Sequence, residues 1–525
     1  MNKKTNAILF FGVIGLLLLL FGVEFFEGIW SFPSFSLVPL MVIALLGTGI
    51  YTTIILGFPQ IKYLKHGLKV TRGDYDNPNE PGDLNHFQAL TTALSATVGI
   101  GNIAGVATAI YYGGPGALFW MWITAFFGSA LKFAECTLAV EYRDFDSKGM
   151  TAGGPMYTIE KGLGIKWRWL AIIFACFAVI CSFATGNAIQ SFTLSDQIYS
   201  EVSQVVGAEH WLTIKHQLTD WYSVSIQQII NGILIAGISG LVIIGGIKRI
   251  GNVTSYLAPF MAAIYFTAAM LIVFANITEI PSSFAKIFSM AFNPPAAVGG
   301  VAGGTLLVIM NTMLWGVKRG LYSNEAGQGS AAIAHSAAKT NFPVREGAVA
   351  MLGPYIDTII ICTLTGLVIL CTGAWKHTEF YVSISASSIE EYNSAITLGS
   401  FRGTDLINGS LLTSFAFKNG LSWLFNYGDK IITLSVLLFA TSTVISWSFY
   451  GDRATEYLFG EKAIYWYRLI YILFVFIGAN AGIETVWAFG DAALGFMTFP
   501  NLISIIFLTG ALKKMTQEYF KAYNE

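Results

Sequence analysis

Charged residues are scarce in this chain. Asp, Glu, Lys and Arg make up 12% of its 525 residues, whereas 54% are hydrophobic. Because soluble domains carry about 25% charged residues, the shortage excludes an ordinary soluble protein and predicts a chain that crosses a lipid bilayer several times. The formal net charge of −1 gives no sign of a nucleic-acid partner.

Cysteine and histidine are scarce as well. The five cysteines lie in apolar runs without a C-x-x-C pair, so the sequence indicates neither a disulfide framework nor a cysteine metal site. The six histidines form no H-x-x-x-H or H-E-x-x-H pattern, which leaves metal-assisted hydrolysis without ligands. No nucleophile with an adjacent base is visible, and we expect a protein that is not an enzyme.

Long apolar runs are plentiful instead. A membrane-spanning helix needs roughly 20 mostly apolar residues. Candidate spans lie near residues 6–23, 36–57, 88–111, 117–140, 169–190, 226–246, 253–275, 297–320, 347–373, 429–450, 464–480 and 484–511. The first resembles a signal peptide in its charged start and apolar core, but no A-x-A cleavage site follows, which favours an uncleaved extra span.

Lys and Arg are concentrated in alternate loops. If the spans alternate, one side of the membrane has most of the Lys and Arg residues of the loops. Loops 58–87 and 141–168 and the C-terminal tail lie on that side. The opposite loops, 191–225 and 374–428, contain few. Since cytoplasmic loops carry the excess of Lys and Arg, we expect a multi-pass protein of the plasma (inner) membrane with a cytoplasmic C-terminus.

Ten spans remain after the first two are set aside, and they divide into two sets of five. The charge rule makes the sets start from opposite sides, which is the pattern of an inverted repeat. We therefore expect an N-terminal hydrophobic segment, an added helix with a cytoplasmic loop, two five-helix repeats and a cytoplasmic tail. Their predicted bounds are 1–30, 31–87, 88–275, 276–511 and 512–525.

Glycines interrupt the opening span of each repeat. The stretch "ATVGIGNIAG" (96–105) fits a dinucleotide fingerprint in its letters, but an apolar span follows where that motif needs an acidic residue. The second repeat opens with "VGGVAGG" (298–304) and has further glycines at Gly316, Gly320, Gly327 and Gly329. Close helix packing explains a single G-x-x-x-G. Two matched interruptions favour broken helices whose backbone binds an ion or a substrate.

Polar side chains lie at membrane depth near these interruptions. Thr97 and Asn102 are in the first interruption, and Gln190 ends the polar stretch "ATGNAIQ". The later run "FATSTVISW" contains Thr441, Ser442 and Thr443. Hydroxyl and carbonyl oxygens suit an alkali cation, although back-bonding of these hydroxyls to their own helix is the alternative.

Two tryptophans and several charged residues are further candidates. Trp315 and Trp447 are able to wall a small pocket, with a role as interface anchors as the alternative. Lys318, Arg319 and Glu325 form either a salt-bridged cytoplasmic gate or a plain loop pairing. Asp357 lies in an apolar run, where an ionisable residue is by default a functional candidate.

Long motifs resemble a known family. They include "HFQALTTALSATVGIGNIAGVATAI", "GGPGALFWMWITAFFGSALKFAECTLAVEYR", "AGGPMYTIEKGLG", "WGVKRGLYSNEAGQGSAAIAHSAAKT" and "WAFGDAALGFMTFPNLI". In order, they resemble the sodium:alanine (alanine or glycine:cation) symporter family over about residues 36–515. The resemblance implies an all-α, leucine-transporter-like fold with two inverted five-helix repeats after one added helix, and sodium-coupled uptake of small neutral amino acids such as alanine or glycine.

The same resemblance assigns roles to residues. It implies substrate contacts at Thr97, Gly101, Asn102, Gln190, Trp315 and Trp447. It implies a sodium site made of carbonyls near Ala96 and Gly99 with the hydroxyls of Thr441, Ser442 and Thr443. One departure stands out, because Ile100 replaces a threonine of the family's G-T-G-N motif. A proton-coupled transporter and an amino-acid sensor on the same scaffold are the alternative functions.

Overall fold

The fold is seen in a computed structural model that describes residues 40–207, 209–219, 222–293, 305–480 and 484–523. The expected extra span 6–23 and the "VGGVAGG" stretch lie outside the described residues. Eight described helices are long and apolar enough to cross a membrane, and one bent pair adds a ninth. The prediction of a helical, polytopic protein is therefore confirmed.

The first set of five spans follows α3 (Leu40–Ile55), α4 (Pro59–Lys62) and α5 (Leu64–Thr71). It consists of α6 (His86–Thr97) with η1 (Gly101–Gly105) and α7 (Val106–Gly113), α8 (Ala117–Glu141), α10 (Arg168–Phe183) with η4 (Ala184–Ala188) and α11 (Ile189–Val206), α12 (Ile226–Ile243), and α13 (Gly246–Ala275). The hairpin β1 (Asp144–Phe145) and β2 (Thr151–Ala152), α9 (Pro155–Tyr157), η2 (Thr158–Gly162) and η3 (Ile165–Trp167) join α8 to α10.

The second set runs from α15 to α25. It consists of α15 (Thr305–Asn324) with α16 (Ser330–His335), α17 (Pro343–Ala350) with α18 (Leu352–Pro354), η6 (Tyr355–Cys362) and α19 (Thr363–Cys371), α23 (Gly428–Phe459), α24 (Lys462–Asn480), and α25 (Glu484–Ala522). The predicted bounds of the two repeats stay a prediction.

Shorter elements lie between the spans. They are β3 (Lys215–Thr219) and β4 (Tyr222–Ser225), η5 (Ile277–Glu279) and α14 (Ile280–Phe292), and η7 (Ala374–His377), α20 (Glu379–Ser385), α21 (Ile389–Leu398), β5 (Ser400–Phe401), β6 (Thr404–Asp405) and α22 (Gly409–Leu421). The predicted loop 191–225 is thus partly wrong, because α11 continues to Val206 before the β3–β4 hairpin.

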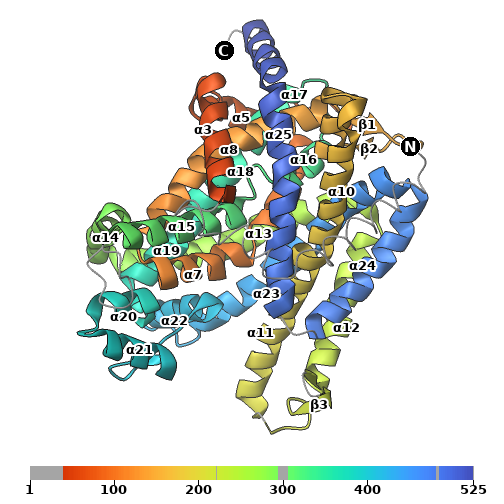
Figure 1. Cartoon of the computed structure of the whole chain (residues 1–525). Coiled ribbons are helices and arrows are strands. Elements are labelled where there is room, and N and C mark those ends of the chain that lie inside the picture. Colours follow the sequence, from red (N-terminus) through yellow and green to blue (C-terminus); the bar gives the residue numbers. More distant parts are fainter. Residues whose placement is uncertain (1–39, 208, 220–221, 294–304, 481–483, 524–525) are drawn as a thin grey trace.

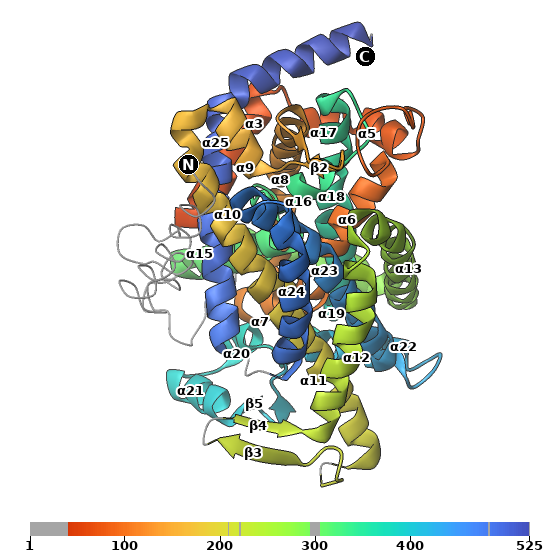
Figure 2. The same ribbon diagram turned by 90° about the vertical axis from the view of Figure 1, so that its right-hand side faces the viewer.

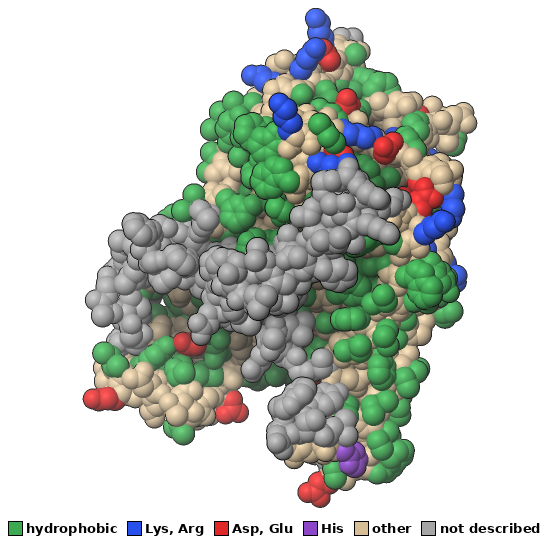
Figure 3. Space-filling model, turned by 45° about the vertical axis from the view of Figure 1, so that its right-hand side comes forward, with side chains coloured by type: hydrophobic (Ala, Val, Ile, Leu, Met, Phe, Trp, Pro, Cys, Tyr) green, Lys and Arg blue, Asp and Glu red, His purple; other side chains and the backbone are tan. Residues whose placement is uncertain are grey.

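The molecule has two distinct ends (Figures 1 and 2). One end carries α5, α17, the β1–β2 hairpin and the C-terminal turns of α25, and we call it the basic end. The other carries the β3–β4 hairpin and α20–α22, and we call it the hairpin end. In Figure 3, Lys and Arg side chains gather at the basic end above a largely hydrophobic flank. That distribution matches a protein with a lipid-facing middle.

Local sequence explains where α6 starts and how α15 packs. Asn85 and Gln88 form a capping box that begins α6. Gly316 and Gly320 lie inside the continuous helix α15, where a Cβ would come within 2.3 Å of the Ala117 carbonyl oxygen and 2.2 Å of Thr124 Oγ1. These two glycines therefore permit close packing on α8 and do not break the helix.

Candidate functional site

The first broken helix turns at the predicted glycines. The axis bends by 54° between α6 and the segment Gly101–Gly113. The side chain of Asn102 supports the turn, because its Oδ1 accepts a hydrogen bond of 2.9 Å from the amide of Gly99. Within the turn, the amide of Asn102 donates to the carbonyl of Gly99 at 3.2 Å. The segment that follows the break presents a helix N-terminus, which favours an anion.

The second broken helix turns later than the glycine pattern suggested. α15 ends at Asn324, and Glu325, Gly327 and Gly329 all have positive φ angles of 51°, 80° and 83°. Such angles are easy for glycine and unusual for glutamate. The prediction that Gly316 and Gly320 belong to the interruption is wrong, because α15 is continuous through both and the break within the described residues 305–335 is the turn between α15 and α16.

Two polar side chains from other helices satisfy the backbone of this second turn. Glu135 on α8 accepts a hydrogen bond of 3.1 Å from the amide of Gly329. Asn501 on α25 donates to the carbonyl of Gly327 at 2.9 Å and to Glu135 at 2.8 Å. A non-helical backbone is tolerated at membrane depth only with partners of this kind.

A small cavity of about 10 Å³ lies between the two breaks. Its walls come from α6, η1, η4, α11, the second break, α23 and α25. The lining residues are Ala96, Thr97, Gly99, Ile100, Gly101, Thr185, Gln190, Tyr322, Glu325, Thr443, Trp447 and Leu494. This volume admits about one water molecule, so an amino acid fits only if the walls move apart, and the smallest ones need the least movement.

Acceptor groups and one large aromatic face this cavity. Gln190 Oε1 is buried and has no hydrogen-bond partner among the described residues, while its Nε2 donates to the carbonyl of Thr185 at 3.3 Å. The buried Glu325 carboxylate accepts from Ser330 Oγ at 2.5 Å. Trp447 is fully buried against η4, where a Cβ on Gly186 would lie 2.4 Å from it. The cavity thus offers oxygens to a cationic group beside a wall that limits side-chain size.

Two predicted substrate residues lie elsewhere. Asn102 does not line the cavity, because its Nδ2 turns away to donate to Asp357 Oδ1 at 2.5 Å and to Ser323 Oγ at 3.1 Å. The Asp357 carboxylate also accepts from Thr358 Oγ1 at 2.8 Å. Trp315 lies further toward the hairpin end, with its ring stacked 4.5 Å from that of Tyr112.

The predicted sodium ligands separate into two groups. Ser442 Oγ and Thr443 Oγ1 each lie 3.1 Å from the carbonyl oxygen of Ser95, and Thr443 Oγ1 also lies 3.4 Å from that of Ala96. These oxygens meet where α6 ends against α23. Thr441 does not reach them, because its hydroxyl bonds back to the carbonyl of Leu437 at 2.7 Å.

The donor set fits an alkali cation. Hard, neutral oxygens from hydroxyls and carbonyls are the ligands such ions prefer. The Ser95 hydroxyl adds another oxygen that is buried without a hydrogen-bond partner among the described residues. Gly99 lies at the same place, since a Cβ there would be 3.0 Å from Thr443 Oγ1.

The basic end is closed beneath these breaks. Arg143 donates to the carbonyls of Pro81, Ser336, Ala338 and Thr340 at 2.6–2.9 Å, which ties the start of α6 to the end of α16. The buried carboxylate of Glu346 on α17 also joins the two half-helices. It bonds to the rings of His86 and His335, the latter at 2.5 Å.

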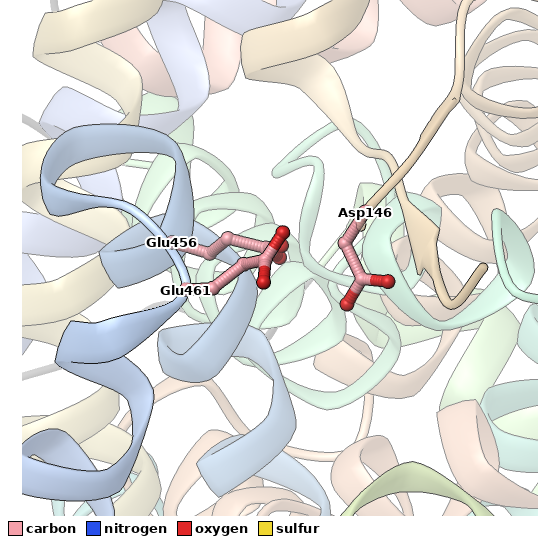
Figure 4. Close-up of side chains that lie close together, drawn as sticks. All are labelled: Asp146, Glu456 and Glu461. Atoms are coloured by element: carbon pink, nitrogen blue, oxygen red, sulfur yellow. The ribbon is translucent and has the colours of Figure 1, made fainter. Parts of the chain in front are cut away.

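A carboxylate cluster lies at the same end (Figure 4). Asp146, Glu456 and Glu461 each place an oxygen within 4.8 Å of the other two. Protein donors already bind each of them. Asp146 accepts from the Lys148 and Met150 amides at 2.8 Å, Glu456 pairs with an arginine at 2.7 Å, and Glu461 accepts from a serine at 2.7 Å. The cluster therefore joins the β1–β2 loop to the α23–α24 corner.

Comparison with known proteins explains this architecture. The model of the sodium:alanine symporter family matches residues 26–525. The chain belongs to this family. It is therefore a multi-pass membrane protein of a transporter family and not of an enzyme family.

Individual relatives of the symporter cover almost its whole length. The sodium/alanine symporter AgcS of Methanococcus maripaludis is 41% identical over 94% of this chain and 96% of its own length. The putative sodium/proton-dependent alanine carrier YrbD and the probable sodium/glutamine symporter GlnT, both of Bacillus subtilis, are 33% and 32% identical over 91% of this chain, which is 88% and 87% of their own lengths.

A solved structure supports the fold of the symporter. MhsT in complex with L-phenylalanine aligns with a TM-score of 0.53 over 82% of this chain and 90% of its own, at 12% identity. At this identity the likeness concerns the fold alone, and it confirms the predicted leucine-transporter-like architecture.

Sequence reasoning missed part of the site. Glu325 was a candidate for a cytoplasmic gate, yet it lines the inner cavity. Arg319 lines the larger cavity toward the hairpin end, and no salt bridge joins it to Glu325. Thr185, Tyr322 and Leu494 were not singled out. The acidic residue in "SNEAG", inside an otherwise apolar repeat, is the signal that points to Glu325.

Proposed function

We propose that this protein is a sodium-coupled symporter that imports small neutral amino acids, alanine or glycine, by alternating access. The observation that carries the proposal is the small cavity between two broken helices, next to a separate set of neutral oxygens at the α6–α23 contact. The relative AgcS is named a sodium/alanine symporter, which agrees with this proposal.

The amino acid is held by its two charged ends. Its α-carboxylate meets the start of the helical segment that follows the break at Gly101, because helix N-termini favour anions. Its ammonium group meets Gln190 Oε1 and the Glu325 carboxylate, both of which are buried beside the cavity. Trp447 limits the side chain to about the size of a methyl group.

Sodium is the proposed coupling ion, and the oxygens of Ser95, Ala96, Ser442 and Thr443 are its proposed ligands. Two of these belong to the last turn of α6 and two to α23. An ion there favours the conformation in which α6 stays against α23 and the first break keeps its shape. Such a difference in affinity between conformations is what coupling requires.

The conformation suits loading from the hairpin end. A vestibule leads from that end to the inner cavity, whereas hydrogen bonds around Arg143 and Glu346 close the basic end. The excess of Lys and Arg at the basic end supports a cytoplasmic position for that end, and the proposed membrane is the plasma (inner) membrane. Loading from outside and release inside then follow from rocking of the helices around the cavity.

Proton coupling is the second candidate function. Glu325 and Asp357 are buried carboxylates within or next to the site, and such groups carry protons in membrane transporters. The name of the relative YrbD includes both ions.

Uptake into proteoliposomes tests both functions. We expect radiolabelled alanine or glycine to accumulate under an inward sodium gradient and not under a potassium gradient. Equal uptake in both salts refutes sodium coupling, and uptake driven by a pH gradient without sodium favours the proton alternative. Binding without uptake favours a sensor. Gln190→Ala should raise the apparent Km for alanine by roughly 10-fold, because the ammonium loses a charge-assisted hydrogen bond.

A further inference from the structure

A separate cleft lies at the basic end, away from the inner cavity and the vestibule. Its walls come from the β1–β2 loop, the turn between α12 and α13, and the corner where α23 leads into α24. It has a volume of about 410 Å³, which is within the range of about 300–1,000 Å³ for small-molecule pockets. The charged residues that line it are Asp146, Lys148, Lys248, Arg453, Glu461 and Arg468. The cleft thus offers groups of both signs to a ligand.

The cationic groups of this cleft retain donors for a phosphate. Arg453 pairs with Glu456 at 2.7 Å and is only 4% exposed, yet its buried Nε has no acceptor among the described residues. Lys148 and Lys248 are exposed and make no ion pair with the described part of the chain. Arg468 is occupied, because its Nε donates to a buried aspartate of the same corner at 2.8 Å. An unmet buried donor is costly, and a hydrogen bond between ionised groups is stronger than a neutral one.

The carboxylates of the cleft retain room for an ammonium group. Asp146 and Glu461 line the cleft, and with Glu456 each places an oxygen within 4.8 Å of the other two (Figure 4). Asp146 accepts the amides of Lys148 and Met150 through Oδ1 at 2.8 Å, and no described donor reaches its Oδ2. A carboxylate has about four acceptor positions and a primary ammonium has three donors. The cluster therefore has oxygens for a protonated amine in addition to its contacts within the protein.

The cleft opens onto an apolar face. Next to it, α12 and α24 lie side by side (Figures 1 and 2). Ile244 and Leu469 line the cleft and are 59% and 37% exposed. Away from the cleft, the same two helices continue with apolar side chains that are 46–67% exposed, namely Leu234, Ile238, Leu241, Ile470 and Leu473. Such a face belongs against lipid chains, and a pocket with basic side chains at the end of membrane helices suits a lipid headgroup.

We propose that this cleft binds the headgroup of phosphatidylethanolamine from the leaflet at the basic end. The phosphate meets Lys148, Lys248 and Arg453 Nε. The ammonium meets Asp146 and Glu461, and the acyl chains lie along α12 and α24. The two arginines are offset by carboxylates of their own corner, so two lysines face two carboxylates, and the cleft matches a headgroup with both charges. The site does not depend on the proposed transport function.

Equilibrium binding of radiolabelled lipid to the purified, delipidated full-length protein in detergent tests this site. Dioleoyl-phosphatidylethanolamine should bind about 10-fold more tightly than dioleoyl-phosphatidylcholine, whose methylated ammonium donates no hydrogen bond. Lys148→Gln together with Lys248→Gln should weaken the binding of both lipids by roughly 10- to 100-fold, because the phosphate loses two charged partners. Asp146→Asn keeps an acceptor for the loop amides and should reduce the preference between the two lipids to less than about 2-fold. Lys513→Gln, an exposed lysine outside the cleft lining, should bind both lipids as the wild type does.

Several outcomes would overturn the proposal. Equal affinities of the wild type for the two lipids refute the site, because the lipid then only covers the apolar face. Tighter binding of dioleoyl-phosphatidylglycerol, which has no ammonium group, refutes the role of the carboxylates. Glycerophosphoethanolamine, the headgroup without acyl chains, should not displace the lipid at equal concentration, and displacement indicates a site for a soluble phosphate ester instead. Unchanged lipid affinity in the variant that lacks both lysines refutes the phosphate contacts. If that variant fails to fold, the loss of lipid preference in Asp146→Asn remains the deciding measurement.

Discussion

Thr443→Val should weaken the dependence of transport on sodium far more than Thr441→Val. The two hydroxyls lie two positions apart on α23 and have different partners. Thr443 Oγ1 lies 3.1 Å and 3.4 Å from the carbonyl oxygens of Ser95 and Ala96, whereas Thr441 Oγ1 bonds to Leu437 in its own helix at 2.7 Å. Valine keeps the shape of threonine and removes only the hydroxyl.

The expected size of the effect follows from the loss of one oxygen ligand. A polar contact to a charged group contributes about 1.5–3 kcal/mol, which corresponds to roughly 10- to 100-fold in the half-saturating sodium concentration. Alanine uptake into proteoliposomes, measured against sodium concentration, provides that constant. The Thr441→Val control should differ from the wild type by less than about 2-fold, since its lost bond is a local back-bond.

The same measurement is able to refute the assignment. If the two variants have equal sodium constants, or if Thr441→Val has the larger effect, the contact between α6 and α23 is not the sodium site. A loss of uptake in Thr443→Val at every sodium concentration is separated from misfolding by thermal unfolding of the purified protein.

Three further predictions concern packing in the core and the lining of the inner cavity. Glu346→Gln, which disrupts a buried bond to two histidines, should lower the free energy of unfolding by about 3–5 kcal/mol, against at most about 1 kcal/mol for the exposed Glu518→Gln. Gly316→Ala should lower the free energy of unfolding by about 1–3 kcal/mol, because the added Cβ would lie 2.3 Å from a backbone oxygen. A Cβ at Gly237 would meet nothing within 4 Å, so Gly237→Ala should leave that free energy unchanged. Ile100 lines the inner cavity, and Ile100→Thr removes part of its side chain, so uptake of 2-aminobutyrate relative to alanine should rise about 10-fold. An unchanged ratio would show that isoleucine in place of the family's threonine does not affect substrate choice.

Prediction from sequence succeeded where a signal repeats along the chain. Runs of apolar residues, alternating loop charge and a glycine break in each half were enough for the helical membrane fold and for the first break at Gly99 and Gly101. The second break was placed too broadly, because Gly316 and Gly320 carry the same letters as Gly327 and Gly329. Only their neighbours separate the two pairs, since the first packs on α8 and the second has positive φ angles.

The sequence by itself determined the class of protein and the places of most spans along the chain, because burial in lipid acts on composition over many residues. It also indicated the family, through long motifs that resemble it. The tertiary structure alone decided which side chains meet. It directs Thr443 to α6 and Thr441 back to its own helix, turns Asn102 toward Asp357, and places Arg319 in the vestibule with Trp315. The reason is that a contact between helices depends on which face of each helix a residue occupies, and on a partner hundreds of positions away in the chain.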